Sequence, residues 1–151
     1  MTGYIYPDGL DCVWIASDRN GHLGAFVTAG VGPIPVQALR SDLLDIRDVE
    51  EAVCHLPQVS KVSLLVSIKR PDDFIAMAER GFFVYDWRDA HRSIGESKNA
   101  YEPVAVPLNP ISTSTLPEPL ANLVENITLR NWDFIGGESL DICAQMECCR
   151  L

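Results

Sequence analysis

Two apolar runs near the N-terminus flank a polar tetrapeptide, and this pattern predicts a β-hairpin. Both faces of the runs 13–16 and 23–28 are largely apolar. The segment between them, Asp18-Arg19-Asn20-Gly21, contains an Asn-Gly pair, and these two residues tolerate the positive φ angles that tight hairpin turns need. Because neither face is polar, we expect the hairpin to lie centrally in a sheet or to be covered on both sides.

Four helices are predicted from apolar spacing and capping residues. A short one follows the Gly- and Pro-rich turn at 30–35 and runs from Val36 to about Arg40 or Leu43. The second begins at Asp45 as N-cap and ends at Pro57. The third begins near Pro71 and ends at Gly81. The fourth covers 120–127, where apolar residues recur at i, i+3, i+4 and i+7.

Further strands are predicted at four places along the rest of the chain. The runs 61–68 and 82–87 are apolar, and we expect 61–68 to be a buried strand. The run 102–108 is expected at a sheet edge because its prolines cannot donate to a neighbouring strand. The run 130–135 is a candidate final strand, and the tail after it is either a terminal helix or partly frayed.

Together these elements predict an α+β fold in a single domain, 1–151. The sheet is expected to be mostly antiparallel and built on the N-terminal hairpin, with about three or four helices packed on it. A parallel pair formed through a crossover at 61–87 is left open.

The chain is acidic, which limits its partners. It has 21 Asp and Glu against 12 Lys and Arg, a net charge of −9 and a pI near 4.6. Such a charge repels phosphate backbones and anionic membranes and attracts a basic partner. The alternative explanation is that the acidic residues serve only to keep the protein soluble. No signal peptide and no apolar stretch of about 18 residues is found. We therefore expect a cytoplasmic protein that binds neither nucleic acid nor membrane.

No catalytic, cofactor or metal-binding motif is found in the sequence. The three histidines, His22, His55 and His91, belong to no recognisable motif, and His22 beside the hairpin turn is the most site-like of them. The C-terminal cysteines Cys143, Cys148 and Cys149 lack the second pair that a zinc site requires. We therefore expect no enzyme activity, no cofactor and no metal.

Two surface groups are candidates for contact with a partner. The first comprises four acids of the predicted second helix: Asp45, Asp48, Glu50 and Glu51. The alternative for this group is a solvated face whose acids complement the helix dipole. The second group, Asp86, Trp87 and Asp89, places an aromatic residue between acids at a strand end, although Trp87 could equally belong to the core.

Three segments carry a resemblance to a family: WIASDRNGHLGAFVTAGVGPIP (14–35), FIAMAERGFFVYDW (74–87) and YEPVAVP (101–107). The chain over about 12–120 resembles small proteobacterial proteins that are similar to immunity proteins of polymorphic or type VI-secreted antibacterial toxins. The resemblance implies an inhibitor that binds a cognate toxin and has no catalytic residues of its own. Together with the acidic charge and the predicted cytoplasmic location, it implies a toxin with a basic surface that acts on nucleic acid or nucleotides.

Two other classes of function are weighed against the immunity hypothesis. A small enzyme or ligand-binding domain would use a pocket near the hairpin, with His22 or His91 and nearby Asp residues. A deep apolar pocket with shifted ionisation would favour this alternative, whereas a shallow acidic face would favour toxin binding. A structural subunit of a larger assembly would instead expose a large apolar patch.

Overall fold

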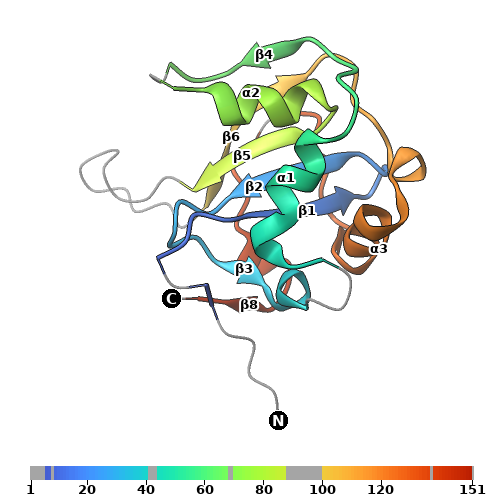
Figure 1. Ribbon diagram of the computed structural model, residues 1–151. Helices are drawn as coiled ribbons and strands as arrows, with labels where there is room; N and C mark the ends of the chain where they lie inside the picture. Colours follow the sequence, from blue (N-terminus) through green and yellow to red (C-terminus); the bar gives the residue numbers. More distant parts are fainter. Residues whose placement is uncertain are drawn as a thin grey trace.

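A six-stranded mixed sheet forms the centre of the protein (Figure 1). The structure is a computed structural model that describes residues 6–7, 9–40, 44–67, 70–87, 100–136 and 138–150. The strand order is β4-β6-β5-β2-β1-β7. The strands are β1 (Val13–Asp18), β2 (Leu23–Val27), β4 (Val62–Leu64), β5 (Phe83–Trp87), β6 (Tyr101–Pro107) and β7 (Thr128–Leu129).

Most strand pairs are antiparallel, as the sequence predicted. The pairs β1–β2, β4–β6 and β5–β6 are antiparallel, while β2–β5 and β1–β7 are parallel. The β2–β5 pair is the parallel pairing that a crossover through 61–87 allows. A second, two-stranded sheet pairs β3 (Ile34–Pro35) with β8 (Cys148–Cys149). The predicted α+β class and the antiparallel majority are thus confirmed.

Three α-helices pack on one face of the large sheet (Figure 1). They are α1 (Val49–Cys54), α2 (Asp72–Glu79) and α3 (Glu118–Asn126). Four 3-10 helices complete the described elements: η1 (Val36–Leu39), η2 (Ile46–Asp48), η3 (Thr113–Thr115) and η4 (Ile142–Ala144). None of the helices in the described residues combines the length and hydrophobicity that crossing a bilayer requires.

Both faces of the hairpin are buried, and each belongs to its own core. Val13 and Ile15 point to the helix side, where they pack with the apolar residues of α1, α2 and α3. Trp14 and Phe26 point to the opposite side, where their rings stack with centroids 4.0 Å apart. The C-terminal segment covers this second, aromatic-rich core. The prediction of a hairpin covered on both sides is confirmed.

The run 61–68 was expected to be a buried strand, and this prediction is wrong. Within 61–67, the part of the run that the structure describes, only β4 forms, and it lies at the edge of the sheet with β6 as its single neighbour. Leu64 and Leu65 are 37% and 48% exposed. An apolar run is typical of a buried strand. An edge strand, however, has a neighbouring strand on only one side, and composition alone does not distinguish the two.

The prediction that 102–108 forms an edge strand is also wrong. β6 lies inside the sheet between β4 and β5. Its prolines are tolerated because Pro103 lies opposite Tyr85 at a shift in the strand register, and Pro107 is the last residue of the strand. Both are positions at which a missing N–H interrupts little of the ladder.

The C-terminal third differs most from the expectation. The last strand of the large sheet is β7 at 128–129 rather than 130–135, because the chain turns at 130–131. Over its described residues, 138–150, the tail is neither an α-helix nor frayed. Leu140 and Ile142 are buried in the second core, and β8 pairs with β3. The sheet, the helices and this tail together fix the surfaces described next.

Candidate functional site

Three carboxylates from separate segments converge on the helix side of the protein. Asp11 precedes β1, Glu50 lies in the first turn of α1, and Asp73 lies in the first turn of α2. Among the described residues, no Lys, Arg or His nitrogen comes within 4.0 Å of these three carboxylates. We call them the acidic trio.

The pKa shifts of Glu50 and Asp11 include contributions from the other acids of the trio. Burial raises the pKa of Glu50, and the negative charges of Asp73 and Asp11 raise it further. Burial also raises the pKa of Asp11, with Asp73 adding to the rise, even though the N–H of Ala29 donates a hydrogen bond to the Asp11 carboxylate and lowers the pKa. The ionised forms of Glu50 and Asp11 are therefore less stable here than in water.

Local structure holds the trio in place. The Ala29 N–H donates to Asp11 Oδ1 at 2.9 Å, and the Thr28 hydroxyl accepts hydrogen bonds from the N–H groups of Cys12 and Gly30. Glu50 and Asp73 lie at helix N-termini, where the helix dipole favours a negative charge. Helices α1 and α2 contact each other, and Arg80 at the end of α2 donates hydrogen bonds to the carbonyls of Cys54 and Leu56 at the end of α1.

The four acids predicted on the second helix are not equivalent. Glu50 belongs to the trio, and Asp48 and Glu51 are exposed on the turns beside it. Asp45 instead caps η2 and binds the Arg47 guanidinium at 2.8 and 3.0 Å. Arg47 lowers the pKa of Asp45 to about 2. Asp45 is therefore already paired within the chain and has less to offer a cationic partner.

The second predicted group is only partly described. Trp87 is 9% exposed and packs edge-on against Tyr101, with ring centroids 5.1 Å apart. Asp86 is half-buried and lies opposite Glu102 in the sheet. Asp89 and His91 lie outside the described residues. Because Trp87 is part of the aromatic core, this group does not present an exposed aromatic side chain.

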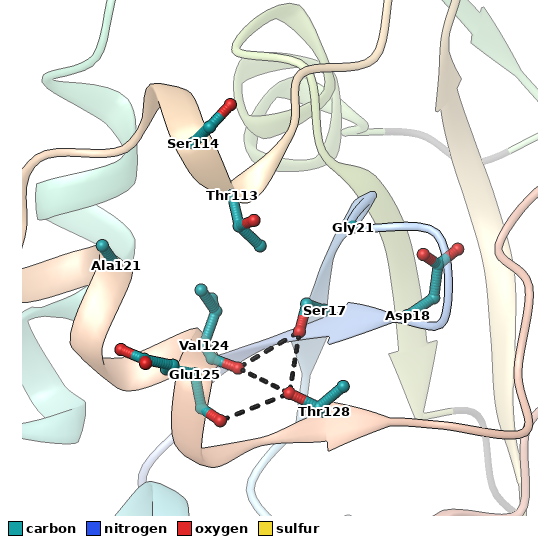
Figure 2. A pocket seen from close by; sticks show the side chains of 9 residues that line it. All are labelled: Ser17, Asp18, Gly21, Thr113, Ser114, Ala121, Val124, Glu125 and Thr128. Carbon is teal, nitrogen blue, oxygen red and sulfur yellow. Dashed lines mark hydrogen bonds between the residues drawn. The ribbon is translucent and has the colours of Figure 1, made fainter.

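A hollow of about 390 Å³ lies beside the hairpin turn, between η3 and α3 (Figure 2). Figure 2 shows the hydroxyls of Ser17 and Thr128 pointing toward each other and toward the last carbonyls of α3. Ser17 donates to the Val124 carbonyl at 3.2 Å, and Thr128 lies 3.3 Å from the Glu125 carbonyl. These hydroxyls thus satisfy carbonyl groups at the end of a helix.

The chemistry of this hollow does not match the enzyme alternative. It is open and lined mainly by small or polar side chains, and His22 is not among its lining residues. Asp18 borders it, but the carboxylate of Asp18 accepts backbone hydrogen bonds in the hairpin turn. A nucleophile with an adjacent base is not formed by its lining residues. The acidic trio is therefore the better candidate site.

Sequence reasoning found Glu50 but missed Asp11 and Asp73. Asp73 carried a signal, because an acid in the first turn of a predicted helix complements the dipole. Nothing local pointed to Asp11, whose position follows from the Ala29 contact and from the packing of β1 below the helices.

Comparison with protein-family models, with curated proteins and with solved structures finds no match for this chain. The resemblance to immunity proteins therefore stays a prediction from the three sequence segments.

Proposed function

We propose that this protein is a cytoplasmic immunity protein that blocks a cognate antibacterial toxin by binding it stoichiometrically. The observation that carries the proposal is the convergence of Asp11, Glu50 and Asp73 without a cationic partner among the described residues. Holding ionised carboxylates near one another, with Glu50 half-buried, destabilises the folded protein. A basic partner removes this cost, because its Lys and Arg side chains stabilise the ionised acids.

The proposed partner is a toxin that acts on nucleic acid or nucleotides. Such an enzyme presents cationic side chains to phosphate groups, and the acidic trio with the exposed acids Asp48, Glu51 and Asp72 would occupy or cover that surface. Exposed acids chiefly accelerate association, whereas a trio carboxylate that becomes buried against Arg or Lys slows dissociation. Because a cationic partner lowers the pKa of Asp11 and Glu50, the complex should also tighten as pH rises through their raised pKa values.

The test uses the protein encoded beside the gene for this chain as the toxin candidate. The variant Asp11→Asn/Glu50→Gln/Asp73→Asn keeps the side-chain shapes and removes the three charges. The control Glu118→Gln/Glu125→Gln/Glu147→Gln also removes three charges, from exposed positions outside the trio. We expect the trio variant to weaken binding about tenfold or more and to lose protection of cells that express the toxin, with little change for the control.

Two outcomes would contradict the proposal. If the neighbouring gene products neither bind this chain nor are neutralised by it, the immunity function is wrong. If the two variants weaken binding equally, the net charge matters and the acidic trio is not the contact site.

A further inference from the structure

A second group of side chains, independent of the proposed function, converges at the hairpin turn. Asp18 is its fixed member. Oδ1 of Asp18 accepts hydrogen bonds from the N–H groups of Asn20 and His22 at 2.8 and 2.9 Å, and Oδ2 accepts one from the N–H of Phe134 at 2.9 Å. The Asp18 side chain is fully buried. The carboxylate thus joins the hairpin turn to the C-terminal segment in a single orientation.

His22 and Asp133 bring two more ligand-type atoms to this carboxylate. One atom from each of Asp18, His22 and Asp133 lies within 4.8 Å of the other two. Nδ1 of His22 is buried without a hydrogen-bond partner and lies 3.7 Å from Asp18 Oδ2. That distance is too long for a hydrogen bond. It is close to the separation of about 3.4 Å between two ligands that each lie about 2.1 Å from one tetrahedral metal ion.

We propose that Asp18, His22 and Asp133 bind a divalent transition-metal ion through one imidazole nitrogen and two carboxylate oxygens. This mixed donor set suits ions such as Zn²⁺ and Mn²⁺. The ion gives the buried Nδ1 of His22 a partner and offsets the charge of two neighbouring carboxylates. Oδ2 of Asp18 accepts one backbone hydrogen bond and retains a lone pair that can face the ion.

The Asp18 side chain is fully buried while His22 and Asp133 are partly exposed, so an ion would reach the site from their side. Asp133 borders an open hollow of about 380 Å³, which Arg19 and Glu138 also line. The guanidinium of Arg19 lies 3.7 Å from Asp133 Oδ2, and its side chain is largely exposed. Arg19 therefore competes with a metal ion for Asp133, and removing its charge should strengthen metal binding.

Mn²⁺ is the probe of choice for this site. The chain has five cysteines, none of them in a disulfide, and thiols bind Zn²⁺ strongly but Mn²⁺ weakly. Electron paramagnetic resonance of free Mn²⁺ gives the affinity and stoichiometry for the full chain. We expect one ion per chain, with affinity reduced about tenfold or more by His22→Gln and by Asp133→Asn.

Two further variants separate this site from general attraction to an acidic protein. Glu138→Gln removes a carboxylate from the same hollow but from outside the three ligands, and should leave the affinity unchanged. Arg19→Gln should increase the affinity several-fold. The side chains of His22 and Asp133 are 24% and 30% exposed, so we expect the fold to tolerate their substitution. Circular dichroism checks that each variant folds.

The wild-type protein supplies a test that needs no variant. Bound Mn²⁺ should broaden the amide resonances of Asn20, His22 and Phe134 before those of other residues. Broadening centred on Glu50 and Asp73, no binding at about 1 mM Mn²⁺, or equal affinity in the wild type, His22→Gln and Asp133→Asn would overturn the proposal. In that case the three side chains only stabilise the turn.

Discussion

At the scale of single residues, the hydroxyl of Tyr101 connects three parts of the second core. It accepts a hydrogen bond from Trp14 Nε1 at 3.1 Å and donates one to the Pro33 carbonyl at 2.7 Å. The side chain is fully buried. Tyr85 belongs to the same core, but its buried hydroxyl makes no hydrogen bond of good geometry. Burial raises the pKa of Tyr85 to about 12, although the nearby indole N–H of Trp132 lowers it. The two tyrosines thus form a natural pair for comparison.

Removing each hydroxyl should therefore have different effects. Tyr101→Phe leaves the Trp14 indole N–H and the Pro33 carbonyl buried without partners, and should lower the free energy of unfolding by about 2 kcal/mol. Tyr85→Phe removes a hydroxyl whose one nearby donor, the indole N–H of Trp132, lacks good hydrogen-bond geometry, and should change the free energy of unfolding by less than about 0.5 kcal/mol. Urea unfolding of both variants gives the comparison. Equal losses would show that the hydrogen bonds of Tyr101 contribute no net stability.

At the scale of elements, the sequence predicts local features well and pairing partners poorly. The Asn20-Gly21 turn defined the hairpin, and the spacing of Leu120, Leu123 and Val124 defined α3. Such patterns depend on residues a few positions apart. Whether a strand lies at an edge depends on distant segments, so β4 and β6 were each assigned to the wrong place in the sheet.

The residues of the candidate site likewise differ in how far the sequence predicts them. Glu50 could be predicted because it belongs to a helix N-terminus with several acids. Asp73 carries the same local signal, but the proximity of Asp73 and Asp11 to Glu50 depends on how α1, α2 and β1 pack, which no local pattern encodes. Asp133 likewise meets Asp18 and His22 across more than a hundred residues of sequence.

The contact between the C-terminal segment and the hairpin can be tested at Gly24. A Cβ atom at this position would lie 2.5 Å from Cζ of Phe134, which is buried in the second core. Gly24→Ala should therefore lower the free energy of unfolding by about 2 kcal/mol, a typical cost of overpacking. Thermal unfolding of Gly24→Ala, Phe134→Leu and the double variant measures the coupling. Strictly additive losses in the free energy of unfolding would show that Gly24 and Phe134 are not energetically coupled.

At the scale of the whole molecule, the protein carries nine excess negative charges, and some of them destabilise its fold. The pKa of Glu50 is raised by burial and by Asp73 and Asp11, although a helix N-terminus by itself favours the ionised form. The folded state thus holds the Glu50 proton more tightly than the unfolded state does. Stability contributed by this group is present at low pH and is lost as pH rises through its raised pKa.

Glu50→Gln should therefore stabilise the protein at neutral pH. The expected gain in the free energy of unfolding is up to about 0.5 kcal/mol at pH 7.5, because the side chain is only half-buried. The gain should vanish near pH 4, where the wild-type carboxyl is protonated. Melting temperatures at both pH values test this, with the exposed neighbour Glu51→Gln as the control. A loss of stability at pH 7.5 would mean that the helix dipole outweighs the burial of Glu50.

The central claim is that the acidic trio receives a basic protein partner, and the rate of association tests it most directly. Stopped-flow mixing with the neighbouring-gene toxin candidate would give the association rates of the wild type, the trio variant and the three-charge control. The rates would be measured at about 0.05 M and 0.5 M salt, because the Debye length shortens severalfold over that range. We predict that the trio variant associates about tenfold more slowly at low salt and that this difference shrinks at high salt. Equal rates for the trio variant and the control at low salt would contradict the claim.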